Sequence, residues 1–138
     1  MPLVPLFGTE GLCNEAHNAF RFRRTYVAPD RGVPFLSSSD IIDLRPEPDR
    51  HVSRRLTPRL EQLLVRQWDV LISCSGTVGN VALAGERLTG MALSQHAIRV
   101  RAPDPEIAGY ATAFLRSRAG RVQLTQAAYG SVVVHIEP

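Results

Sequence analysis

The sequence contains no lysine: all 16 of its cationic side chains are arginine, against 13 acidic residues, for a net charge of +3. Arginine presents a planar pair of donors that fits phosphates and guanine edges in a way that lysine cannot. A coding bias in a GC-rich genome is an alternative cause of the same composition. The modest net charge does not exclude nucleic acid, because the distribution of charge matters more than its sum.

Long apolar runs are also missing, and cysteine is scarce. No run approaches the roughly 20 residues needed to span a bilayer. The first residues, Met1 to Phe7, carry no basic group ahead of their apolar side chains, unlike a signal peptide. We therefore expect a cytoplasmic protein with no membrane contact. Cys13 and Cys74 lie far apart in sequence and predict free, partly buried thiols.

Spacings typical of metal, nucleotide or nucleophile chemistry do not occur. There is no C-x-x-C or H-x-x-x-H pair, so we expect no metal and no cofactor. The segment Gly76–Gly79 lacks the lysine of an NTP-binding loop. Ser73–Gly76 precedes a turn, but its glycine spacing does not match a nucleophile elbow. A hydrolase using Ser75 or Cys74 stays a minor alternative, which requires a histidine within hydrogen-bond reach.

The middle of the chain predicts a small sheet. Val70–Ile72 and Val81–Leu83 are short apolar runs, and the small, polar, glycine-containing stretch between them predicts a hairpin. A third strand is predicted from Met91 to Arg101. Apolar residues and arginines alternate at its end, so that Ile98 and Arg99 fall on opposite faces, one apolar and one cationic.

The segments before this sheet predict loops and short extended pieces. Residues 1–19 are difficult to assign and are expected to be mainly loop. Phe20–Val27 alternates apolar residues with arginines and predicts a strand with a basic face. Val33–Leu36 is expected to be a short extended piece, which Pro34 would keep at an edge. Ser37–Asp40 predicts a cap that opens one helical turn.

Helices are predicted mainly in the last third of the chain. Thr57 and Pro58 can begin an earlier helix that runs to Val65. An apolar stripe predicts a helix over 106–117, and Gly120 is expected to separate it from a second helix over 121–128. Val132–Val134 predicts a last strand. We therefore predict one α+β domain over residues 1–138, with strands first and mainly helices later.

The remaining candidate function is a binding surface for nucleic acid. Arginine suits phosphates and guanine, glutamine and asparagine suit adenine, and hydroxyl groups suit phosphates or bases. A solvated polar face without a ligand explains the same residues equally well. The predicted DNA-contacting side chains are Arg23, Arg24, Ser38, Ser75, Thr77, Asn80, Gln95, His96 and Arg99.

Four motifs, in the same order, resemble those of specificity subunits of type I restriction–modification systems. The resemblance covers about Phe20 to Pro138. The motifs are Gly32–Ile41 (GVPFLSSSDI), Trp68–Gly79 (WDVLISCSGTVG), Leu93–Arg99 (LSQHAIR) and Tyr129–Pro138 (YGSVVVHIEP).

The resemblance implies a non-catalytic target recognition domain, with a small barrel-like β-rich part followed by a helical part. Such a domain reads a few base pairs of double-stranded DNA for methyltransferase and restriction subunits. Full specificity subunits carry two such domains separated by spacer helices, whereas this sequence holds one domain and no spacer helix. An excised domain, a truncated gene and a split half-subunit are alternative explanations of this expectation, and the last of them implies a second half-subunit as a further partner. The main alternative is a protein-binding domain without affinity for DNA.

Overall fold

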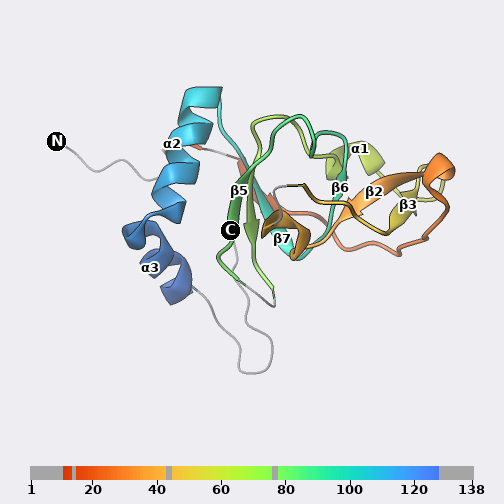
Figure 1. The fold of residues 1–138 in the computed structure, drawn as a ribbon, viewed down its shortest axis with the longest axis horizontal. Coiled ribbons are helices and arrows are strands. Elements are labelled where there is room, and N and C mark those ends of the chain that lie inside the picture. The colour runs from red at the N-terminus through yellow and green to blue at the C-terminus, as the bar shows by residue number, and fades with distance from the viewer. Residues whose placement is uncertain (1–10, 14, 43–44, 76–77, 128–138) are drawn as a thin grey trace.

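The computed structural model describes residues 11–13, 15–42, 45–75 and 78–127, which form two sheets and two long helices (Figure 1). None of the helices in this part of the chain is long and apolar enough to cross a membrane. The predicted last strand, Val132–Val134, lies outside the described residues. The elements are β1 (Glu15–Asn18), η1 (Pro29–Arg31), β2 (Gly32–Leu36), η2 (Asp40–Ile42), β3 (His51–Ser53), α1 (Leu60–Leu63), β4 (Val70–Ser73), β5 (Val81–Leu83), β6 (Ala92–Leu93), β7 (Ala97–Arg101), α2 (Pro105–Arg116) and α3 (Arg118–Ala127).

The larger sheet has four antiparallel strands in the order β1-β7-β4-β5. The predicted hairpin is confirmed, because β4 and β5 pair with Val70 opposite Leu83. Residues 1–19, which the sequence left difficult to assign, contribute β1, an edge strand beside β7 that was not predicted. Its sequence, Glu-Ala-His-Asn, has no apolar alternation, so the pairing with β7 rather than local preference makes it a strand.

The single strand predicted from Met91 to Arg101 is wrong, because this segment forms two strands in different sheets. A turn at Ser94 separates them: the His96 N–H donates to Ser94 Oγ (3.0 Å) and the Ala97 N–H donates to the Ser94 carbonyl (3.2 Å). The Ser94 hydroxyl thus gives the backbone a hydrogen-bond partner other than a neighbouring strand. After the turn, β7 joins the four-stranded sheet, whereas β6 runs parallel to β2 in the other sheet.

The smaller sheet has the order β3-β2-β6, which places β2 in the centre. The expectation that Pro34 keeps this strand at an edge is therefore wrong. Pro34 pairs with His51 of β3, whereas pairing with β6 starts only at Phe35. Pro34 is therefore tolerated, because the pairing with β6 does not require the backbone N–H that proline lacks. The segment Phe20–Val27 is extended but is not a full strand: only Tyr26 forms a bridge, to Val52 of β3.

The two long helices confirm most of the helical prediction. α2 begins where the Asp104 side chain accepts the Ile107 N–H (2.9 Å). Gly120 does not separate the helices, because it lies inside α3, where a Cβ would be 2.7 Å from Leu115 Cα. Glycine therefore permits the two helices to approach closely. The earlier helix predicted from Thr57 is only the single turn α1, preceded by Arg59 at φ 47°.

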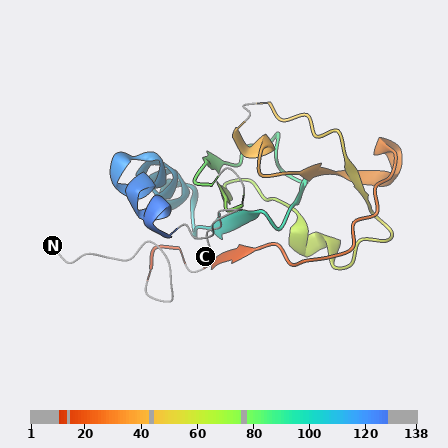
Figure 2. The same cartoon turned by 90° about the horizontal axis from the view of Figure 1, so that it is seen from below.

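The four-stranded sheet is covered on both faces, as Figures 1 and 2 show from two directions. Val70 and Ile72 of β4 pack with Ala111 and Leu115 of α2, whereas Leu71 packs on the opposite face. The three-stranded sheet lies beyond that face, away from the helices. The α+β class is thereby confirmed. The described strands form two sheets rather than a closed barrel, so the barrel-like detail stays a prediction.

Candidate nucleic-acid interface

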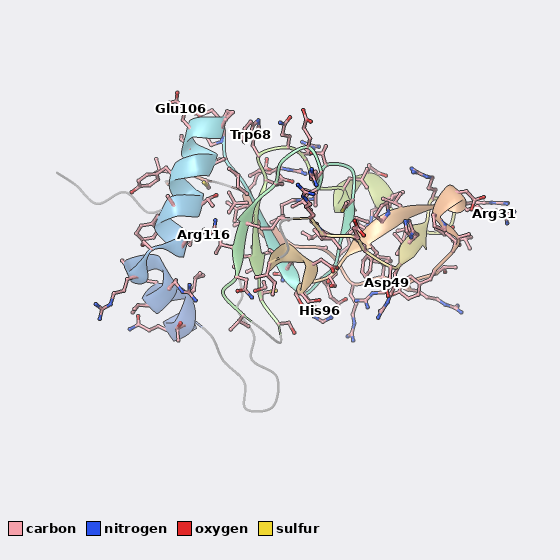
Figure 3. All side chains as sticks on the ribbon, in the orientation of Figure 1. Arg31, Asp49, Trp68, His96, Glu106 and Arg116 are labelled. Atoms are coloured by element: carbon pink, nitrogen blue, oxygen red, sulfur yellow. The ribbon has the colours of Figure 1, made fainter. Side chains whose placement is uncertain are left out.

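Three polar segments meet at one end of the four-stranded sheet, and we call them the loop cluster: residues 73–75 with 78–80, residues 94–96, and Asn18. The Cys74 N–H donates to the His96 carbonyl (3.0 Å), and the Asn18 amide donates to the Gln95 carbonyl (3.2 Å). The Asn80 N–H donates to Ser73 Oγ (2.9 Å). In Figure 3, His96 lies at the opposite end of the sheet from Trp68.

The loop cluster contains four of the predicted DNA-contacting residues. Asn80, Gln95 and His96 are half-buried, whereas Ser75 is almost completely buried. Thr77 lies outside the described residues. These predicted residues come from two segments about 20 positions apart, and the pairing of β4 with both β5 and β7 brings them together.

The serine-rich turn before η2 adjoins the loop cluster. The Ser94 N–H donates to the Leu36 carbonyl (3.1 Å), which places the start of the turn beside β6. The Asp40 carboxylate accepts hydrogen bonds from the Ser37 N–H (2.7 Å) and hydroxyl (2.6 Å). Ser38 is half-buried within this turn. Because the negative charge of Asp40, two residues away, repels a phosphate, Ser38 is a weaker candidate for a phosphate contact than an isolated hydroxyl would be.

Four aromatic rings form a continuous series beside the smaller sheet, which we call the aromatic row. Phe20 lies 5.8 Å from Phe22, Phe22 lies 6.3 Å from Phe35, and Phe35 lies 6.2 Å from Tyr26, between ring centroids. The Phe22 and Phe35 rings meet edge to face, and the other two pairs are tilted, which are favourable geometries for aromatic pairs. The row connects the segment after β1 to the middle of β2.

Arginine side chains lie over three of the four rings. A ring fixes the guanidinium through its quadrupole but does not neutralise the charge, unlike a carboxylate. The charge therefore stays available to an anion. One of the three, Arg50, also approaches Asp49 (3.9 Å). The pairs are Arg59 over Phe20 (4.2 Å to the centroid), Arg24 over Phe35 (5.1 Å) and Arg50 over Tyr26 (5.6 Å).

Arg23 and Arg24 occupy opposite sides of the extended segment. Arg24 is half-buried against Phe35, whereas Arg23 is exposed, as the alternation in the sequence indicates. Sequence reasoning missed Asn18 and Arg59. Asn18 belongs to the unpredicted β1, and Arg59 contacts a ring 39 positions earlier in the chain, so neither had a local signal.

Arg99 is in the interior, where only 5% of its surface is exposed. Arg99 donates to the Gln62 and Leu64 carbonyls (3.0 and 3.2 Å). The helical turn α1 and the residue that follows it therefore cover the predicted cationic face of β7. Burial lowers the pKa of Arg99, and neighbouring Arg101 lowers it further. Arg101 pairs with Asp69 (2.9 Å). Both arginines therefore have structural roles, and the predicted DNA contact of Arg99 gains no support.

Cys74 is buried, with 3% of its surface exposed, and its thiol accepts a hydrogen bond from the Asn18 amide (3.1 Å). Burial raises the pKa of this thiol. An activated nucleophilic cysteine requires the opposite, a lowered pKa and access to solvent. The environment of Cys74 thus argues against this thiol as a hydrolase nucleophile.

Three solved structures have a similar fold. The HsdS subunit from Thermoanaerobacter tengcongensis matches 92% of this chain with a TM-score of 0.61 and 21% identity. A structure of the type I R-M system, described for its complex assembly and conformational transition, matches 91% with a TM-score of 0.53 and 21% identity. The type I restriction–modification S subunit from M. genitalium matches 98% with a TM-score of 0.49 and 12% identity.

The chain spans about one third of the length of these structures: 31% and 32% of the first two, and 34% of the third. No family model matches the sequence, and no curated protein matches it either. The resemblance to type I specificity subunits that the four motifs indicated is confirmed at the level of the fold.

Proposed function

We propose that this chain is a target recognition domain that binds a short sequence in double-stranded DNA. It would act in the cytoplasm without catalysis of its own, directing methyltransferase and restriction subunits. The fold of the HsdS subunit supports this proposal. One geometric observation carries it: the segment from Asn18 to Arg24 joins the loop cluster to the aromatic row. Asn18 contacts Gln95, and six residues later Arg24 lies over Phe35.

This arrangement suits a division of labour on a duplex. Arginines beside the aromatic row, above all Arg23 and Arg24, would hold backbone phosphates and fix the orientation of the domain. Gln95 in the loop cluster has a side-chain amide that can pair bidentately with adenine. Asn80 carries the same group, but its Nδ2 atom is buried without a hydrogen-bond partner among the described residues, so the side chain would have to turn outward to meet a base. His96 is a further base-contacting candidate of this cluster, whereas Ser75, with 8% of its surface exposed, would contact a base only if the loop moved. Phosphate contacts would supply most of the affinity, and the loop cluster the discrimination between sequences.

Fluorescence anisotropy of a labelled duplex across a salt series tests the phosphate contacts. The wild-type protein is expected to bind at low salt, with an affinity that falls linearly on a log–log plot. Because each phosphate contact contributes about 0.9 to that slope, the double variant Arg23→Gln/Arg24→Gln should lower it by about 2. The matched control is Arg118→Gln/Arg121→Gln, which removes the same charge from exposed positions of α3 on the far side of the four-stranded sheet.

An equal loss of slope in the two double variants would contradict the placement of the phosphate contacts. No binding by the folded wild-type protein at low salt would contradict DNA binding itself, and would favour the protein-binding alternative.

Selection from a random duplex pool tests base readout. One short sequence should be enriched, and Asn80→Ala or Gln95→Ala should relax the preference at particular base pairs, at about 1–3 kcal/mol per lost bidentate contact.

A further inference from the structure

A hollow of about 460 Å³ lies between β1, α1 and β7, next to the loop cluster. This volume is within the range of about 300–1,000 Å³ that is usual for small-ligand sites. Its lining combines apolar surface with several polar side chains, and positive charge exceeds negative. The polar and cationic lining residues are Asn18, Arg59, Gln62, Arg66, Arg99 and Arg101, and we call the site the arginine pocket.

Hydrogen bonds within the fold hold the two arginines at the base of the arginine pocket. Arg99 is held by the carbonyl groups of Gln62 and Leu64. Arg101 is held by both carboxylate oxygens of Asp69 (2.9 and 3.3 Å) and by the Leu64 carbonyl (3.3 Å). Burial is the main cause of the lowered pKa of Arg99, and Arg101 and Arg66 lower it further while Asp69 and Glu15 act in the opposite direction. These contacts define where the positive charge of the base lies before any ligand arrives.

The rim contributes two exposed arginines whose charges are not cancelled by bonding. Arg59 lies 4.2 Å over the Phe20 ring, and its backbone has the left-handed φ of 47°, which is uncommon for a residue other than glycine. Such a conformation persists where surrounding contacts hold it. Arg66 is exposed, and its side chain makes no hydrogen bond or ion pair with the described residues. Among the described lining residues, Glu61 supplies the single carboxylate.

We propose that the arginine pocket binds a phosphate group. Arg59 and Arg66 would supply the planar pairs of donors that fit phosphate oxygens, and the side-chain amide of Gln62 would add a neutral donor. The phosphate could belong to a DNA backbone or to a free nucleotide, since the chemistry is the same. Phosphate binding by the arginine pocket does not depend on the proposed DNA function. If the phosphate belongs to a DNA backbone, the pocket would extend the proposed DNA-binding surface from the aromatic row, through Phe20.

The direct test is a titration of the ¹⁵N-labelled protein with inorganic phosphate at constant ionic strength, following the Nε–Hε signals of its arginines. Arg59 and Arg66 should shift saturably in the wild-type protein. The variant Arg59→Gln/Arg66→Gln should weaken phosphate binding at least about tenfold, and Arg66→Gln alone should weaken it without disturbing Phe20. The control Arg118→Gln/Arg121→Gln should bind as the wild type does.

Two further arms identify the source of the phosphate. If the pocket serves a DNA backbone, an unlabelled duplex should displace inorganic phosphate, and Arg66→Gln should weaken duplex binding. If it serves a nucleotide, AMP should bind at least about tenfold more tightly than inorganic phosphate, and duplex should not compete. The variant Arg23→Gln/Arg24→Gln, which leaves the pocket intact, should still bind phosphate. Failure of DNA binding and failure of the pocket are therefore separate results.

Shifts of Arg59 and Arg66 that do not saturate would overturn the proposal. Equal phosphate binding by the wild type and by Arg59→Gln/Arg66→Gln, both shown to be folded by circular dichroism, would overturn it as well. In either case the arginine pocket would be a structural ion-pair site only.

Discussion

Two pairs of arginines lie in similar sequence patterns and have different surroundings. On β7, Arg99 and Arg101 alternate with valine and isoleucine, and the chain around α1 covers them. Before β2, Arg23 continues an alternation with Phe20 and Phe22, and Arg24 follows it directly, so that Arg23 is exposed and Arg24 lies over a phenylalanine ring. Alternation therefore identifies which face of an extended segment an arginine occupies, and it does not tell what covers that face.

The difference also separates stability from binding. The inner pair, Arg99 and Arg101, satisfies backbone carbonyls and the buried Asp69, so its charge is used within the fold. The outer pair, Arg23 and Arg24, has no carboxylate partner among the described residues, so its charge is available to a ligand. Variants of the inner pair should change the free energy of unfolding, and variants of the outer pair should change affinity.

The largest expected effect is on the inner pair. Arg99→Leu removes a buried donor and leaves the Gln62 and Leu64 carbonyls without its hydrogen bonds. We expect the free energy of unfolding to fall by about 3 kcal/mol, measured by urea denaturation. Arg23→Leu is the control, and as an exposed substitution it should change stability by no more than about 0.5 kcal/mol. Equal stability of the two variants would contradict the structural role of Arg99.

Two helix glycines extend the test to the packed side of the sheet. Gly120→Ala places a Cβ against the backbone of Phe114 and Leu115, so we expect a loss of about 1–3 kcal/mol. Gly109→Ala in α2 meets nothing within 4 Å and should stabilise by about 0.5–1 kcal/mol. Thermal unfolding measures both variants. The same sign for both would contradict the close approach of the helices at Gly120.

The sequence predicts best the elements whose local pattern and tertiary environment agree. The β4–β5 hairpin follows from two apolar runs on either side of a polar turn, and α2 follows from its apolar stripe and the Asp104 cap. Tyr110 shows the limit even there, because it belongs to the predicted stripe and is 58% exposed. The apolar stripe of α2 is wider than the helix face that the sheet covers, so the residues at the edge of the stripe are exposed to solvent.

Elements that depend on distant partners could not be predicted. β1 has no apolar alternation and exists because β7 offers an unpaired edge. The burial of Arg99 depends on carbonyls 35 and 37 positions away in sequence. The same limit applies to the candidate site. Asn80 and Gln95 are both among the predicted DNA-contacting residues, but the role of Asn18 in joining their loop cluster to the aromatic row required the fold.

A substitution in the outer pair can separate the contribution of the arginine–ring contact to DNA affinity from the contribution of the positive charge. Arg24→Lys retains the charge but loses the planar group over Phe35 and the bidentate donors. We expect duplex affinity to fall by about threefold with an unchanged salt slope, because the number of neutralised phosphates is the same. Anisotropy across the salt series measures both quantities. A slope reduced as strongly as in Arg24→Gln would mean that the lysine no longer reaches its phosphate.

The smallest expected effect concerns two buried thiols, that of Cys74 in the loop cluster and that of Cys13. Burial raises the pKa of Cys74 and of Cys13, so the folded state retains protons that the unfolded state loses. Stability is therefore complete below the unfolded thiol pKa and is lost as the pH rises through the folded value, by about 0.3 kcal/mol per thiol between about pH 7.5 and 8.5. Urea midpoints at the two pH values measure this loss, and Cys74→Ala should remove its share. Stability that instead rises over this interval, with Cys74→Ala abolishing the rise, would mean that the folded state favours the thiolate, and the hydrolase alternative would regain its nucleophile.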